Sequence, residues 1–105
     1  PPDAVFVTND HMAFAVMDIL RFELGISVPN DVSVVGYDDV QIAAWASYNL
    51  TTVRQRANVM VAETIDILMS RLDDADMPAR RVCIDGPLII RGSARLPQGS
   101  KNARL

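Results

Sequence analysis

Two short stretches decide the fold class of this chain, Val7-Thr8-Asn9-Asp10 and Val34-Val35-Gly36-Tyr37-Asp38-Asp39. Each is an apolar run that ends abruptly in amide or carboxylate side chains. A continuous apolar run of about four to six residues is typical of a parallel strand that is buried on both faces. A strongly apolar stretch of helical length separates the two runs. The sequence therefore predicts a strand–helix–strand unit of the α/β class.

The other expected elements extend outward from this unit. We predict strands over 4–8 and 32–37 and a helix over 11–24, which Asn9 or Asp10 caps and Gly25 ends. Residues 50–53 are β-rich, and 57–72 carry the single apolar stripe of a second helix. Short strands are expected over 82–84 and 88–90. The tail, 92–105, shows no periodicity, and we expect it to be mostly disordered.

Polar side chains gather where the two predicted strands end. Asn9 and Asp10 follow the first strand, and Asp38 and Asp39 close the second. In open α/β sheets, ligands bind outside the carboxyl ends of the strands. The sequence therefore predicts a ligand site at this end of the sheet.

Length and composition exclude several classes of protein. The 105 residues make one small domain or part of a larger one, half of them are hydrophobic, and the net charge is −3. No basic stripe occurs, so this segment should not bind nucleic acid by itself. The single cysteine, Cys83, suits a reducing compartment, and we interpret it as a buried structural thiol. With no signal-peptide core and no membrane-spanning run, we expect a cytoplasmic location and no membrane partner.

Residues for catalysis or metal binding are scarce. His11 is the only histidine, which leaves no multi-histidine metal site, and we expect it to be solvated in the first turn of the helix. Asp10, Asp38 and Asp39 could hold a divalent cation, as in phosphoacceptor domains. Those domains also need a nearby lysine, and the only lysine here is Lys101. We predict no metal, no cofactor and no enzymatic activity.

The first helix is apolar on more than one face. Its wider face could cover a sheet and contains Met12, Ala13, Ala15, Val16, Ile19 and Leu20. Phe14 and Met17 fall outside this arc. A helix that is apolar on two faces usually buries both, so these two residues lie either under a loop of their own domain or in a subunit interface.

Four segments together, in their order and spacing, carry a specific resemblance: TNDHMA at 8–13, VPNDVSVVGYDD at 28–39, LTTVRQ at 50–55 and LIIRGS at 88–93. They resemble the effector-binding core of the lactose-repressor/galactose-repressor (LacI/GalR) family of bacterial transcription regulators. The resemblance runs from about residue 2 to residue 97. It covers the last third of such a protein, the carboxyl-terminal part of the core.

The resemblance implies a partial periplasmic-binding-protein-like fold, a parallel sheet flanked by helices. In the family, two α/β lobes joined by three crossover strands hold the effector in the cleft between them. Residues 1–50 then belong to the carboxyl-terminal lobe and 51–56 form the third crossover. We assign 57–91 to the amino-terminal side of the cleft, as the last helix and strands of the core.

The resemblance also implies an effector site. Asp38 matches the family's effector-binding acid, and a carboxylate can accept hydrogen bonds from two adjacent hydroxyls of a sugar. Asn9 matches the cleft asparagine; it could also cap the helix, and the two roles can coexist. Gln55 could contact ligand or bridge the lobes, whereas Arg54 is interpreted as a structural ion-pair partner. The chain departs from the family at Arg56 and Ala57, which weakens any inference about which sugar binds.

The implied partners are a small sugar-like effector and a second copy of the chain. Phe14, Met17, Trp45 and Ala46 match positions at the family's dimer interface. The expected function is effector sensing and dimerisation in a regulator that contacts DNA only through a headpiece absent from this chain. The alternative is a periplasmic sugar-binding protein of a transporter, which has the same fold and cleft. The residues that precede Pro1 would distinguish the two.

Overall fold

The computed structural model describes residues 2–97, which form two compact units. The first unit contains the chain up to Arg54 together with the segment that begins at Pro87, and the second is Gln55–Gly86. The segment from Pro87 to Arg91 therefore belongs with the sheet of the first unit.

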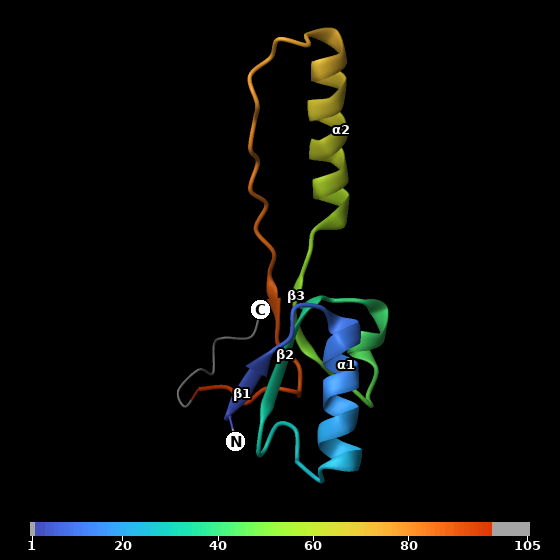
Figure 1. The fold of residues 1–105 in the computed structure, drawn as a ribbon, viewed down its shortest axis with the longest axis vertical. Coiled ribbons are helices and arrows are strands. Elements are labelled where there is room, and N and C mark those ends of the chain that lie inside the picture. The colour runs from blue at the N-terminus through green and yellow to red at the C-terminus, as the bar shows by residue number, and fades with distance from the viewer. Residues whose placement is uncertain (1, 98–105) are drawn as a thin grey trace. The chain divides into compact units, whose positions relative to one another are not determined.

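The first unit is built on a four-stranded sheet in the order β1-β2-β3-β4 (Figure 1). The strands are β1 (Ala4–Phe6), β2 (Ser33–Asp38), β3 (Thr51–Arg54) and β4 (Leu88–Ile89). The first three are parallel to their neighbours, and β4 runs antiparallel to β3. This mostly parallel sheet confirms the predicted α/β class. Residues 82–84, expected to form a strand, are irregular.

Helix α1 (Asp10–Asp18) connects β1 to β2 and begins at the predicted cap. The side chain of Asn9 accepts a hydrogen bond of 2.8 Å from the Met12 amide, which satisfies one of the unpaired donors of the first turn. The helix continues as a π-helical segment, Ile19–Glu23. Gly25 follows with φ of 65°, a left-handed conformation that glycine adopts without steric cost and that ends the helix as predicted.

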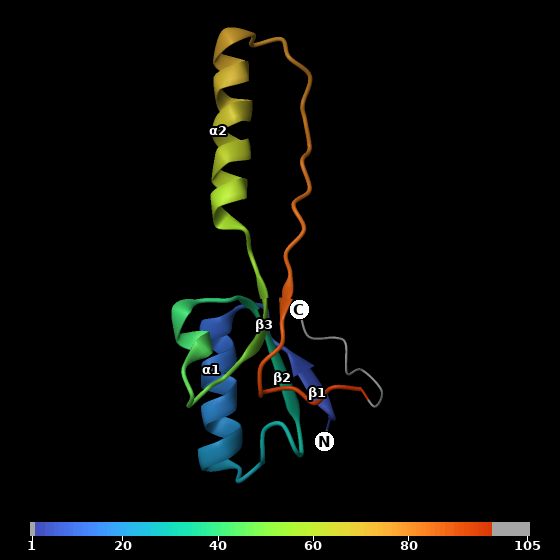
Figure 2. The ribbon, with the colours of Figure 1, turned by 180° about the vertical axis from the view of Figure 1, so that it is seen from behind.

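Helix α1 lies against the sheet, as both views show (Figures 1 and 2), and the core lies between the two. It contains Ala13, Phe14, Met17, Val28, Val34, Ala43 and Leu50. Complete burial of a side chain the size of Leu50 or Met17 contributes roughly 1.5–3 kcal/mol. These contacts hold α1 on the sheet.

The face of α1 that packs on the sheet is not the one that the sequence suggested. Its buried positions, Asp10, Ala13, Phe14 and Met17, follow the spacing i, i+3, i+4, i+7 of a single helical stripe. Met12 and Ile19, expected in the core, are exposed. The small Ala13 at the centre of the buried stripe lets the helix approach the sheet closely.

The opposite face of the sheet is left uncovered by the described residues of the first unit. Phe6 is 61% exposed, and Tyr37 and Leu88 are exposed as well. The strand register places Phe6 beside Val35, and Val53 between Tyr37 and Leu88, so these apolar side chains share one face. The prediction of strands buried on both faces is therefore wrong for this part of the chain.

The start of the expected disordered tail is ordered. Ser93 is fully buried, and its hydroxyl donates to the Val34 carbonyl at 2.6 Å and accepts from the Thr51 amide at 2.8 Å. The Gly92 amide donates to the Asn49 carbonyl, and the Arg95 guanidinium donates to the Asp3 carbonyl. The rest of the predicted tail, 98–105, lies outside the described residues.

The second unit contains helix α2 (Ala57–Asp73) followed by an irregular segment. The predicted helix is confirmed, but none of its residues is buried, and its apolar stripe is exposed. Arg80 donates to Asp66 at 3.1 Å within this unit. Cys83 is also exposed, which corrects its interpretation as a buried thiol, because the segment around it is not a strand.

Neither α1, α2 nor any other helix among the described residues has the length and apolar character needed to cross a membrane.

Candidate functional site

Asn9 and Asp38 lie at the same end of the sheet. Phe6 of β1 is in register with Val35 of β2, and the Val7 amide donates to the Val35 carbonyl at 2.8 Å. Because the two strands are parallel, the residues that follow them emerge at one edge of the sheet, which we call the rim. Both polar side chains are half-buried there.

The side chain of Asn9 has a structural role that leaves part of it available for binding. Its Oδ1 accepts the hydrogen bond from the Met12 amide that caps α1. The amide NH₂ group of the same side chain is the part that can donate to a ligand hydroxyl. The cap therefore also fixes the direction in which Asn9 presents its donors.

Asp10 joins three segments from beneath the rim. It is completely buried, and its Oδ1 accepts a hydrogen bond of 2.6 Å from the Thr52 hydroxyl on β3. Its Oδ2 accepts a hydrogen bond of 2.9 Å from the Val40 amide, just after β2. Asn9, rather than Asp10, provides the helix cap. The sequence reasoning placed Asp10 at the helix start but missed its partner Thr52.

Gly36 leaves room for this carboxylate. A Cβ atom added at Gly36 would collide with Oδ1 of Asp10 and would lie 2.8 Å from a methyl carbon of Leu50. A residue without a side chain is therefore required for Asp10 to reach Thr52.

The backbone at the end of β2 adopts an uncommon conformation. Asp38 has φ of 133° and Asp39 has φ of 58°, values at which side-chain-bearing residues are rare. Aspartate tolerates the left-handed region better than most residues do. Two consecutive positive φ angles turn the chain sharply and present the half-buried Asp38 at the rim.

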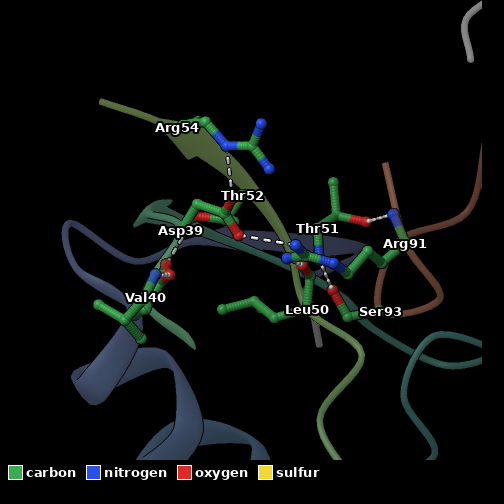
Figure 3. Close-up of polar contacts among 9 residues, drawn as sticks. Asp39, Val40, Leu50, Thr51, Thr52, Arg54, Arg91 and Ser93 are labelled. Carbon is green, nitrogen blue, oxygen red and sulfur yellow. Dashed lines mark hydrogen bonds and ion pairs between the residues drawn. The ribbon is translucent and has the colours of Figure 1, made fainter. Parts of the chain in front are cut away.

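Asp39 forms ion pairs with two arginines (Figure 3). Its Oδ2 accepts from Nε of Arg54 at 2.8 Å, and its Oδ1 is 2.7 Å from a terminal nitrogen of Arg91. The ion pair predicted for Arg54 is thus present. Burial opposes ionisation of Asp39, but the hydrogen bonds and charges of Arg91 and Arg54 outweigh it and lower the pKa of this carboxyl.

Gln55 follows Arg54 directly and is the first residue of the second unit. Its side chain is half-buried. Asn9 and Asp38, the two other predicted effector residues, belong to the first unit. A hollow of about 440 Å³ beside β4 is lined by residues such as Asn49, Ile89 and Leu96, and neither Asn9 nor Asp38 lines it.

Within residues 2–97, no group of three or more histidine, cysteine or acidic side chains is arranged to hold a metal ion. His11 is exposed in the first turn of α1, as expected, and its ring meets that of Phe14 edge-on at 5.8 Å.

The residues predicted at a subunit interface fall into two groups. Met17 is fully buried and Phe14 is 7% exposed, because both pack into the core of their own unit, where Phe14 also meets Tyr48 at a ring distance of 4.3 Å. They offer little surface to a second subunit, and their place at an interface stays a prediction. Trp45 and Ala46 are exposed on the loop that precedes Tyr48.

Comparison with known proteins places this chain in a family. The family model described as periplasmic binding protein-like domain matches residues 1–94, and the chain belongs to this family. Its relatives place it among the LacI-family transcription regulators. It is 36% identical over 93 residues to the ribose operon repressor of Escherichia coli strain K12, an alignment that covers 89% of this chain and 28% of the repressor.

Solved structures of transcription regulators are also similar to this chain, both in fold and in sequence. A complex of the transcriptional regulator CelR with cellobiose has a TM-score of 0.80 and 36% identity, covering 88% of this chain and 28% of that one. A LacI-family regulator from Lactobacillus casei with bound sucrose has a TM-score of 0.72 and 36% identity, covering 89% and 34%. The chain thus spans about a third or less of the proteins that it matches, and these are regulators rather than enzymes.

Proposed function

We propose that this chain is the effector-sensing portion of a bacterial DNA-binding transcription regulator, from the carboxyl-terminal part of its core, acting in the cytoplasm. The observation that carries the proposal is the parallel register of β1 and β2, which delivers Asn9 and Asp38 to one rim. The sugars named with two solved relatives, cellobiose and sucrose, make a sugar or similar polyol the favoured class of effector.

Each rim residue has a distinct part in binding. The carboxylate of Asp38 accepts hydrogen bonds from two neighbouring hydroxyls, and the amide of Asn9 donates to a third. Gln55, at the point where the chain passes into the second unit, adds a further polar contact to the ligand. A ligand held by all three favours one orientation of the two lobes, because it binds that orientation more tightly.

This preference is transmitted to DNA through a homodimer in which Trp45 and Ala46 contact the second copy. Coupling of about 1–3 kcal/mol between effector and operator corresponds to a change in operator affinity of roughly 5- to 150-fold. DNA contact is made by a headpiece outside this chain, and no catalytic step is involved.

Calorimetry on the full-length regulator with ribose, sucrose and cellobiose tests the proposal. We expect at least one sugar to bind, and the substitution Asp38→Asn to weaken it about 10- to 150-fold, because it removes a charged acceptor. Asp3→Asn, an exposed aspartate of the same unit, is the matched control and leaves affinity unchanged. Equal binding by wild type and Asp38→Asn would refute the assignment of the site.

A further inference from the structure

Asp39 links the two segments that connect the first unit to the second. Arg54 is the last residue before the chain enters Gln55–Gly86, and Arg91 lies just beyond β4, where the chain has returned. The two oxygens of the Asp39 carboxylate are divided between them, one to each arginine (Figure 3). One side chain therefore fixes the outgoing and returning segments to the loop that presents Asp38.

The two arginines are held to different degrees. Arg91 also donates from a second terminal nitrogen to the Leu50 carbonyl at 2.9 Å, and its amide donates to the Thr51 hydroxyl at 2.9 Å. The side chain of Arg54 is 53% exposed, whereas that of Asp39 is 6% exposed. Arg91 thus anchors Asp39 to the start of β3, and Asp39 in turn holds the more exposed guanidinium of Arg54.

The backbone at Asp38 and Asp39 needs this support. Two successive residues with positive φ angles cost free energy and persist only where the surroundings determine them. The structure provides three such constraints: the two ion pairs of Asp39 and the hydrogen bond from the Val40 amide to Asp10. All three have a carboxylate as acceptor and are charge-assisted, and two of the three involve Asp39.

We propose that Asp39 is a positioning residue of the effector site, which sets the conformation of Asp38 and couples it to both crossover segments. This inference rests on the proposed function. A ligand that binds Asp38 then acts on Arg54 and Arg91 through one shared carboxylate. Without that carboxylate, the rim can still bind ligand, but binding no longer constrains the segments that lead to the second unit.

Amide hydrogen exchange on the ligand-free full-length protein tests the first half of the inference. We expect Asp39→Asn to accelerate exchange of the Arg54 and Val40 amides about tenfold or more, because the ion pairs that restrict local opening are lost. The amide of Ile26, which donates to the Leu20 carbonyl at the far end of the helix, should be unaffected. Asp3→Asn is the matched control. Unchanged exchange at Arg54 and Val40 would overturn the inference.

The second half is tested with whichever of ribose, sucrose or cellobiose binds the wild type. In the wild type, bound sugar should slow exchange at Arg54 and Arg91. In Asp39→Asn, calorimetry should show the sugar binding up to about tenfold more weakly, because Asp38 is less well positioned. At saturating sugar, the slowing should be lost in Asp39→Asn and, for the Arg54 amide, in Arg54→Gln. If Asp39 served only the stability of the fold, its loss would not abolish the slowing of amide exchange while the sugar still bound. Slowing that persists in sugar-bound Asp39→Asn would therefore overturn the coupling.

The two proposals can fail separately. If none of the sugars binds the wild type, the proposed effector class is wrong, and the exchange rates in the ligand-free protein still decide the role of Asp39. If a sugar binds and Asp38→Asn abolishes binding, but Asp39→Asn matches the wild type in both exchange measurements, the site stands and the positioning role is excluded.

Discussion

At the scale of single residues, the acids at the rim differ in role although they are alike in type. Asp10 is buried and neutral groups donate to it, Asp39 is paired with two cations, and Asp38 is presented at the edge. The sequence located all three but could not separate them. Their partners, Thr52 and Arg91 among them, lie far away in the chain, and no local pattern connects them.

Gly36 gives a prediction at this scale. We expect Gly36→Ala to destabilise the chain by roughly 1–3 kcal/mol, because the added methyl group forces the Asp10 carboxylate or Leu50 to move. Denaturant unfolding measures this change. Gly25→Asn is the comparison, since nothing lies within 4 Å of its Cβ position and asparagine tolerates positive φ. A Gly36→Ala protein as stable as Gly25→Asn would contradict the packing described.

Asp39 gives a second prediction, in the dependence of stability on pH. Its pKa in the folded state is below the ordinary value of 3.8, so its ionisation favours folding above that pH, and this contribution is lost as the pH falls below it. The difference in unfolding free energy between wild type and Asp39→Asn should be largest near neutrality and shrink below about pH 4. Denaturant titrations at several pH values test this, and a difference that grew toward acid would contradict it.

At the scale of elements, apolar patterning predicted the existence of most helices and strands but not the faces that they bury. The strands near 4–8, 32–37, 50–53 and 88–90 and both helices are present. On α1, two apolar stripes overlap, and periodicity cannot tell which one meets the sheet. The stripe that packs there contains Phe14 and Met17, together with Ala13, which both stripes share.

Alanine substitutions on α1 distinguish its two stripes. Met17→Ala should destabilise the chain by roughly 2–5 kcal/mol, because it leaves a cavity in the core. Ile19→Ala, on the exposed stripe, should cost less than about 1 kcal/mol. Denaturant unfolding of both variants gives the comparison. The opposite order would mean that the other face of the helix packs on the sheet.

The residues around Ser93 show why a segment without periodicity can still be ordered. Their order comes from hydrogen bonds between side chains and backbone, such as those of Ser93 with Val34 and Thr51. Such bonds connect residues that are distant in sequence and leave no regular pattern. The short run at 82–84 is the reverse case: its composition favours a strand, yet it pairs with no neighbour in the structure.

At the scale of the whole molecule, much apolar surface of the described residues remains in contact with solvent. In the first unit it lies on the uncovered sheet face, with Phe6 and Tyr37, and on the exposed side of α1. In the second unit it lies along α2, with Val61 and Leu72. Large exposed apolar patches on a single chain mark surfaces that another part of the protein, or another protein, covers.

The chain produced alone, as these 105 residues, should therefore associate in solution. We expect light scattering to give a mass above that of the 11.5 kDa monomer, increasing with concentration, because contact between copies buries this surface. Replacing Phe6 and Tyr37 with serine should reduce the association, since it removes apolar area from the open sheet face. A monomer at high concentration would contradict the prediction.

The antiparallel pairing of β3 with β4 makes the second unit an insertion whose two ends meet. The Arg54 amide donates to the Pro87 carbonyl at 2.9 Å, so the points of departure and return are neighbours in space. A protease that nicks the irregular stretch after α2 would cut the polypeptide without dividing the sheet. The carboxyl-terminal fragment would remain bound through β4 and the Ser93 hydroxyl. Copurification of both fragments after limited digestion, and their separation in denaturant, would show that the first unit tolerates a broken chain.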